Sequence, residues 1–261
     1  MKKRLLCAGL AAAMAVSLTA CGGSAAGTKA EGSSASAEAN SEGGSEAAKV
    51  FKIGGIGPVT GGAAVYGMAV QHGTELAVNE INAAGGINGY QIEFQFQDDE
   101  HDAEKSVNAY NTLKDWGMQV LVGTTTSAPC LAVADKTAAD NMFQITPSGS
   151  VVECAANPNV FRICYSDPDQ GAASATYIGE HKLASKIAVI YDSSDVYSSG
   201  VYEKFAQEAP AQGIEIVAAE HSQPTATRIS PRSFRRQRMP AAEMVFLPIY
   251  YTEVFSDPQQ A

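Results

Sequence analysis

Residues 50–97 read VFKIGGIGPVTGGAAVYGMAVQHGTELAVNEINAAGGINGYQIEFQFQ. The stretch begins with a short β-type run at residues 50–54. It ends with residues 91–97, in which polar and apolar side chains alternate strictly, as in a half-buried strand. Between them, residues 63–84 place small and apolar side chains at helical spacing, and Gly85-Gly86 ends the run. The stretch therefore predicts a strand, a helix and a second strand.

The same alternation of strand and helix continues to about residue 219. It predicts helices at 103–116, 128–141, 170–183 and 199–212, and strands at 120–122, 143–146, 186–191 and 214–218. Strands that alternate with helices indicate a parallel sheet covered on both faces. Because such crossovers are right-handed, each sheet should be doubly wound. We therefore expect an α/β protein with a first lobe at residues 50–165 and a partial second lobe at residues 166–261.

The first 21 residues are typical of a bacterial export signal. Three positive residues, Lys2, Lys3 and Arg4, precede an uncharged apolar run at residues 5–18. That run is shorter than the ~20 residues that a membrane-spanning helix needs. It ends in LTAC at residues 18–21, which resembles a lipoprotein box, so we expect lipid chains on Cys21 to anchor the protein outside the bacterial cell membrane. An ordinary secretory signal with a chance cysteine is the alternative.

Residues 22–49 consist almost entirely of Gly, Ser, Ala and Glu and contain no aromatic residue. Such a segment cannot bury enough apolar surface to offset its chain entropy. We expect it to be a disordered tether between the lipid anchor and the folded lobes.

Charge and cysteine usage restrict the possible partners. The formal net charge is −10 at pH 7, which argues against a nucleic-acid partner.

Of the five cysteines, three lie in the predicted lobes: Cys130, Cys154 and Cys164. Whether Cys154 and Cys164 form a disulfide is left undecided. No C-x-x-C pair suggests a metal or redox site, so we expect neither a metal nor a cofactor.

Three loops that follow predicted strands carry glycine or hydroxyl groups and no charge at their tips. They span residues 54–67, 123–129 and 146–150. Ligands of parallel sheets bind at the carboxyl ends of the strands, so these loops are the candidate site. Hydroxyl and backbone N–H groups suit a carboxylate ligand. The alternative is that Ser127, Ser148 and Ser150 only cap helices.

Two kinds of enzyme site fit the loops poorly. Gly55-x-Gly57 follows a strand, but Gly61 departs from the dinucleotide-binding pattern and Pro58 lacks a backbone N–H for phosphate. The loop with Ser127 lacks the G-x-S-x-G elbow of serine hydrolases, and no histidine lies in a loop that pairs it with a serine. We therefore expect no catalytic residue and no enzyme activity.

Six motifs follow one another along the chain: GGIGPVTGGAAVYG, NEINAAGGINGYQIEF, DDEHDAEKSVNAYN, VGTTTSAP, ITPSGS and FRICYSDPDQG. Their order and spacing resemble the branched-chain amino-acid binding proteins of ABC importers, which have the type I periplasmic-binding-protein fold. The resemblance runs from about residue 50 to residue 221 and resumes at residues 242–254. It implies two doubly wound lobes that close on a free amino acid such as Leu, Ile or Val. It also implies a monomer whose partners are importer permease subunits.

The resemblance assigns roles to the three serines. It places Ser127 at the ligand carboxylate, Ser148 where a backbone carbonyl accepts from the ligand ammonium, and Ser150 where a hydroxyl bridges both groups. A buried zwitterion needs partners at both ends, since an unpaired charge is costly to bury.

The resemblance also implies aromatic and hinge residues. The tyrosines that line the cleft are Tyr66, Tyr197 and Tyr250. The first crossing between the lobes, which forms a hinge, contains Asp167, Asp169 and Gly171.

One segment departs from the family pattern. Residues 223–241 match nothing in it and hold five of the seven arginines of the chain. Permissible codons for this segment, read from the third base, encode ADSNTDFTAQLSAAKDAG, which is similar to a family loop and helix. Residues 255–261, with permissible codons read from the second base, give SLILNK, which is similar to the family helix that follows. We hypothesise that both segments are translated in the wrong frame, which resequencing would decide, with a genuine Arg-rich insertion as the alternative.

The chain stops at Ala261, before the acidic residue that pairs with the ligand ammonium in the family. We therefore expect an incomplete second lobe with exposed sheet edges and no tight ligand binding by this chain. The predicted function is a solute-binding lipoprotein of an ABC importer. The alternatives are a ligand-sensing receptor ectodomain of the same fold, an enzyme, or a non-functional fragment.

Overall fold

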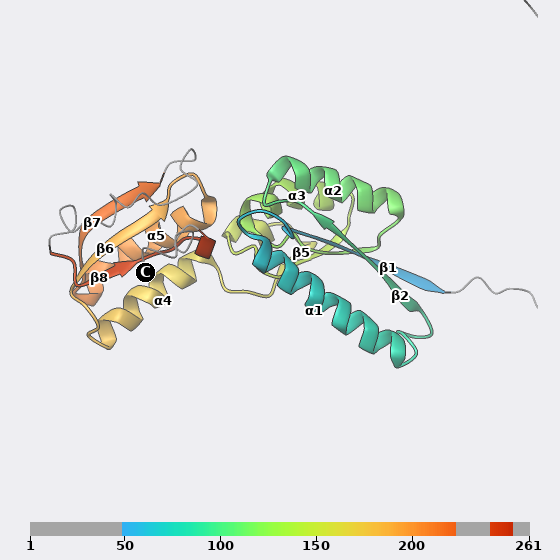
Figure 1. Cartoon of the computed structure of the whole chain (residues 1–261), viewed down its shortest axis with the longest axis horizontal. Helices are drawn as coiled ribbons and strands as arrows, with labels where there is room; N and C mark the ends of the chain where they lie inside the picture. The colour runs from blue at the N-terminus through green and yellow to red at the C-terminus, as the bar shows by residue number, and fades with distance from the viewer. Residues whose placement is uncertain (1–48, 223–240, 253–261) are drawn as a thin grey trace, which may run out of the picture. The chain divides into compact units, whose positions relative to one another are not determined.

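The computed structural model describes residues 49–222 and 241–252 (Figure 1). The predicted export signal, the lipidation site Cys21 and nearly all of the tether lie outside the described residues. So do residues 223–240 and 255–261 of the suspected wrong-frame segments. Within the described ranges, no helix has both the length and the apolar character to cross a membrane.

The first lobe is built on a five-stranded parallel sheet in the order β2-β1-β3-β4-β5. Its strands are β1 (Val50–Gly57), β2 (Gln91–Asp98), β3 (Val120–Val122), β4 (Phe143–Thr146) and β5 (Val160–Arg162). Helix α1 (Ala64–Ala83) covers one face, and α2 (Ala103–Trp116) and α3 (Ser127–Ala139) cover the other (Figure 1). The strand order reverses between β1 and β3, which is where ligands of doubly wound sheets bind. The predicted α/β class is confirmed.

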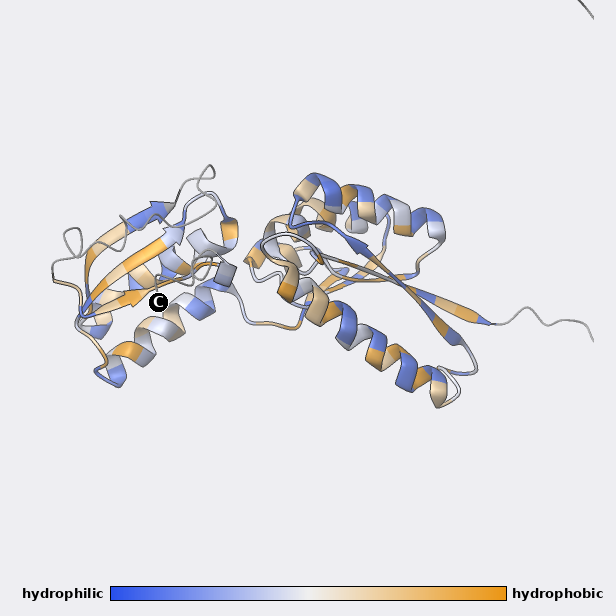
Figure 2. Ribbon diagram, viewed as in Figure 1, coloured by the Kyte–Doolittle hydropathy of each residue, from blue (hydrophilic) through white to orange (hydrophobic). Residues whose placement is uncertain are grey.

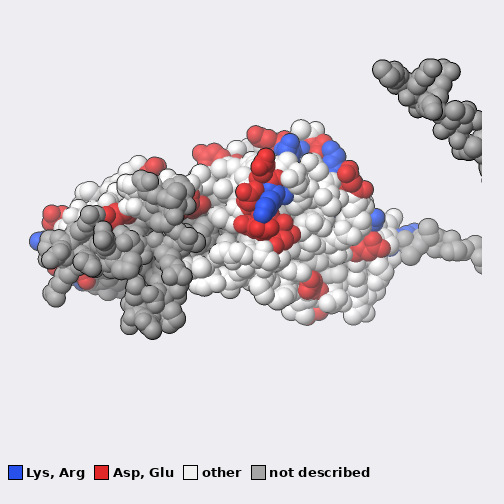
Figure 3. Space-filling view, turned by 45° about the horizontal axis from the view of Figure 1, so that its top comes forward, with Lys and Arg blue, Asp and Glu red and all other residues white. Residues whose placement is uncertain are grey.

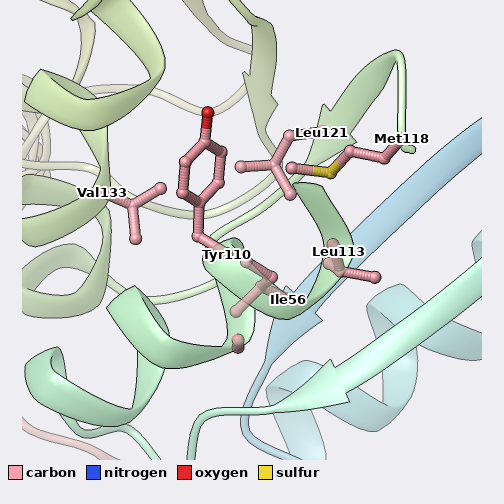
Figure 4. Close-up of a cluster of buried hydrophobic side chains, with 7 residues drawn as sticks. Ile56, Tyr110, Leu113, Met118, Leu121 and Val133 are labelled. Atoms are coloured by element: carbon pink, nitrogen blue, oxygen red, sulfur yellow. The ribbon is translucent and has the colours of Figure 1, made fainter. Parts of the chain in front are cut away.

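Apolar side chains from β1, α2, β3 and α3 form the core of this lobe (Figure 4). Its fully buried members include Ile56, Leu113, Leu121 and Val133. Burial of an aliphatic side chain of this size stabilises the fold by ~1.5–3 kcal/mol. Ile56 and Leu121 lie within two residues of the carboxyl ends of β1 and β3, so the core is close to the loops that leave these strands.

The second lobe is built on a three-stranded parallel sheet in the order β7-β6-β8. The strands are β6 (Lys186–Asp192), β7 (Glu215–Ser222) and β8 (Met244–Phe246), and the helices are α4 (Asp167–Glu180), α5 (Val196–Glu208) and the short η2 (Ala209–Gln212). β6 and β8 are mostly hydrophobic (Figure 2). The ring of Phe205 in α5 stacks on Phe246 at 4.3 Å, so this helix is packed against the sheet.

Helix α4 starts three residues earlier than predicted, because Ser166 caps it. The Ser166 hydroxyl accepts from the Asp169 N–H (3.2 Å), and the Asp169 carboxylate accepts from the Ser166 N–H (3.4 Å). This reciprocal arrangement is a capping box. The proposed hinge residues Asp167, Asp169 and Gly171 therefore lie inside α4, and residues 163–166 form the crossing itself. A hinge function for the three residues stays a prediction.

Three short elements were not predicted: β5, the 3-10 helix that precedes it, and β8 of the second lobe. Strand β5 has three residues, and a 3-10 helix, η1 (Val152–Ala155), precedes it. The middle residue of β5, Phe161, is 51% exposed. This segment therefore lacks the run of buried apolar side chains that would have predicted a strand.

Acidic and basic side chains are mixed on the face shown in Figure 3. In the first lobe, Lys105 pairs with Glu100 at 2.6 Å and Lys114 pairs with Asp140 at 2.5 Å. Exposed pairs of this kind stabilise a fold by about 0–1 kcal/mol each. In each of these pairs the positive charge lies beside a negative one. The two lysines therefore do not form a basic patch on the first lobe.

Candidate functional site

A cavity of about 190 Å³ lies at the carboxyl ends of β3 and β4 and is lined from both lobes. Its lining residues are Tyr66, Thr126, Ser148, Ser150, Cys164, Tyr165, Gln170, Tyr197 and Tyr250. Sites for drug-sized ligands usually measure about 300–1,000 Å³, so this cavity suits a smaller molecule. Five of the six residues predicted to bind the ligand line it, and the lining contains no charged side chain.

Ser127 is the predicted ligand residue that does not line the cavity. It is the first residue of α3 and only 1% exposed. Its hydroxyl oxygen accepts from the N–H of Ser150 (3.1 Å) and from the N–H of Val151 (3.4 Å). Ser127 thus holds the loop that presents Ser148 and Ser150, while its neighbour Thr126 faces the cavity. A direct contact between Ser127 and a ligand carboxylate stays a prediction.

A network of buried hydrogen bonds fixes the loops after β3 and β4 to each other. The Thr146 hydroxyl donates to the Thr124 carbonyl (2.7 Å) and accepts from the Gly149 N–H (2.9 Å). The Gln144 amide donates to the Gly123 carbonyl at 2.8 Å. Paired polar groups of this kind specify one arrangement, because an unpaired buried group is costly. The signal in the sequence was a glutamine between the two apolar residues of the FQIT strand.

Tyrosine rings line the cavity together with the serine loops. The ring of Tyr250 lies 5.4 Å from Tyr66 and 5.3 Å from Tyr197, measured between centroids. These separations are typical of favourable aromatic pairs. Burial raises the pKa of Tyr197 and of Tyr250, so both hydroxyls stay protonated at neutral pH and can donate hydrogen bonds.

His101 was missed as a neighbour of the site, because the sequence showed no loop that pairs a histidine with a serine. It follows β2, and its Nδ1 lies 2.9 Å from the hydroxyl oxygen of Thr126. Its Nε2 lies 3.9 Å from the carboxylate of Asp195, which caps α5 in the second lobe. Burial lowers the pKa of His101 and raises the pKa of Asp195. The pair joins the two lobes beside Tyr250, whose ring is 5.1 Å from the imidazole.

Four other lining residues were not predicted to bind the ligand: Thr126, Cys164, Tyr165 and Gln170. Each of the four lies in one of the six family-like motifs. The motifs therefore located the site more completely than the list of predicted ligand residues did. Gln170 also lies 3.5 Å from the Tyr197 hydroxyl, which connects α4 with α5 at the cavity wall.

Replacing Ser127 by alanine should lower the stability of the protein, because the Ser127 hydroxyl holds the loop that contains Ser150. The change leaves the buried N–H of Ser150 without its acceptor, which costs ~1–3 kcal/mol in the free energy of unfolding. Urea unfolding would measure the loss. Ser174→Ala, in the middle of α4, is the control and should leave stability unchanged or slightly higher. Equal stability of the Ser127→Ala protein and the parent would contradict the anchoring role.

A family model described as a periplasmic binding protein matches residues 50–237. The match covers most of the chain and extends into residues 223–241, which we had expected to match nothing. The Leu/Ile/Val-binding protein homolog 3 of Brucella melitensis is 30% identical over 203 residues, which is 77% of this chain and 55% of that protein. The leucine-, isoleucine-, valine-, threonine- and alanine-binding protein of Pseudomonas aeruginosa is 31% identical over 67% of this chain and 48% of its own length.

The fold agrees with these sequence matches. The branched-chain amino acid transporter substrate binding protein LivJ of Streptococcus pneumoniae, solved with isoleucine, superposes with a TM-score of 0.69. It is 27% identical, and the match covers 76% of this chain and 57% of that one. The chain spans about half the length of the curated relatives it matches. From its motifs, its parallel sheets and these matches, the chain belongs to the periplasmic binding protein family and has the type I fold.

Proposed function

We propose that this chain belongs to an extracytoplasmic solute-binding lipoprotein that captures a branched-chain or similar small amino acid for an ABC importer. The observation that carries the proposal is the cavity that joins the serine loops of the first lobe to tyrosines of the second. Relatives named as Leu/Ile/Val-binding proteins support it. Lipid chains on Cys21 would anchor the protein, which acts as a monomer without a cofactor, and permease subunits are its partners.

The cavity chemistry suits such a ligand. Ser148, Ser150 and Thr126 offer neutral hydrogen-bond partners for the polar end of an amino acid. The tyrosine rings offer apolar surface for an aliphatic side chain. A cationic or acidic side chain would find no opposite charge among the lining residues, and its burial there would be costly. The lining therefore favours aliphatic over charged amino acids.

Titration calorimetry of the 261-residue chain with leucine, isoleucine, valine, lysine and aspartate tests the function. We expect weak but saturable binding of at least one branched-chain amino acid and no binding of lysine or aspartate. Tyr250→Ala should weaken that binding roughly tenfold or more, because Tyr250 contacts both Tyr66 and Tyr197. Tyr90→Ala is the control, since Tyr90 is 43% exposed and does not line the cavity.

Two calorimetric outcomes distinguish the proposed function from the expected incompleteness of the second lobe. Absence of binding by every amino acid would contradict the proposed function for this chain. Tight binding of leucine would support the function and contradict our expectation of an incomplete second lobe.

A further inference from the structure

Two buried cysteines lie directly behind the serine loops. Cys130, in α3, and Cys154, in η1, are both 0% exposed. The Cys154 thiol donates to the Ser127 carbonyl across 3.7 Å. Cys130 lies three residues after Ser127 on the same helix, so the two residues are neighbours on one helix face. The backbone thus brings Cys154 to the turn of α3 that carries Cys130.

The surroundings hold both sulfur atoms in place. A methyl group built on Gly149 would lie 3.2 Å from the Cys130 sulfur, so the loop after β4 packs closely on it. The Gln144 amide also donates to that sulfur, at 3.7 Å. The thiols interact with each other: a hydrogen bond from Cys154 lowers the pKa of Cys130, and Cys130 raises the pKa of Cys154.

We propose that Cys130 and Cys154 are a disulfide-forming pair that fastens η1 to α3 behind the ligand site. The structure has both as free thiols. Cys164, the alternative partner of Cys154, instead lines the cavity. The cross-link would close the segment that contains Ser148 and Ser150 and would hold it against Ser127.

The bond forms by exchange with a small external disulfide. The Cys130 thiolate attacks one sulfur of that disulfide, and one small thiolate leaves. The Cys154 thiolate then attacks the Cys130 sulfur of the mixed disulfide and releases the second small thiolate. The protons of the two protein thiols pass to the two released thiolates. The protein pair is oxidised by two electrons and the external disulfide is reduced.

The buried thiols can be reached by local opening of η1. This helix has only four residues, and Val152 within it is 50% exposed. Short surface segments of this kind open at low free-energy cost. Formation of the bond in the cell rests on the proposed extracytoplasmic location, because disulfides persist in oxidising compartments.

The test is peptide mapping of the full chain after native incubation with oxidised glutathione, compared with a dithiothreitol control. Remaining thiols are alkylated in denaturant before digestion. We expect a Cys130–Cys154 peptide, with Cys164 alkylated. The oxidised protein should melt about 5–10 °C above the reduced protein, since a cross-link restricts the unfolded chain.

Variants sharpen the assignment. Cys164→Ser should keep both the linked peptide and the increase in Tm, and Cys154→Ser should lose both. A map of the parent protein in which Cys130 and Cys154 are both alkylated, or in which Cys164 is joined to either, overturns the proposal. The mapping needs no ligand, so a failure of leucine binding leaves this result unaffected.

Discussion

Gly67→Ala should destabilise the protein by about 3 kcal/mol, the largest loss that we expect from a single methyl group. Gly67 is buried in α1 beside the loop that follows β1. A Cβ at this position would overlap the Pro58 carbonyl oxygen, at a separation of 1.8 Å. Backbone cannot rotate away as a side chain can, so the helix and the loop must separate, and overpacking of this kind typically costs 1–3 kcal/mol or more. Because Tyr66 precedes Gly67, ligand binding should weaken too.

The same helix contains a matched control. Gly73 is exposed, and a Cβ there would meet no atom within 4 Å. Gly73→Ala should therefore stabilise the protein by roughly 0.5–1 kcal/mol through helix propensity alone. Urea unfolding of both variants measures the contrast. If the two substitutions changed stability in the same direction, close packing of α1 on the Pro58 loop would be refuted.

Asp167→Asn should make the protein progressively more stable than the parent as the pH rises. Asp167 is 1% exposed, and neither of its carboxylate oxygens has a partner with hydrogen-bond geometry among the described residues. Burial raises its pKa from 3.8 to about 6, and the nearby Ser150 hydroxyl opposes this shift without cancelling it. The folded parent therefore holds a proton that the unfolded chain releases between these values, so the parent loses stability as pH rises through that window. Asparagine has no such proton to lose.

The measured quantity is the difference in the free energy of unfolding between the variant and the parent. It should move by about 2–3 kcal/mol in favour of the variant from pH 4 to pH 7. Burial also raises the pKa of Asp99 to about 6. This group is present in both proteins, so its contribution to the free energy of unfolding cancels in the difference. A difference that stays constant from pH 4 to pH 7 would show that folding does not raise the pKa of Asp167.

Elements with strong local signals were predicted well. The bounds predicted for α2 agree with the structure, because Asp102 caps its start and Gly117 ends it. The Asp102 carboxylate accepts from the N–H groups of Glu104 and Lys105, and Gly117 has a φ of 90°. Both signals lie within a few residues of the helix, so the sequence alone expresses them.

Features that depend on distant residues could not be predicted in this way. The orientation of Ser127 is set by backbone N–H groups 23 and 24 residues away, on another loop. The pairing of His101 with Asp195 needs both lobes. The motif order located the cavity, but which serine faces it depends on packing that no local pattern encodes.

The buried network beneath the serine loops has a kinetic consequence. Thr146 and Gln144 already hold both loops in one arrangement, so the first lobe offers its hydrogen-bonding groups without prior ordering. A preorganised surface lowers the entropy lost on association. The first encounter of a solute should then be fast. For the solute proposed above, association should not have to wait for ordering of these loops.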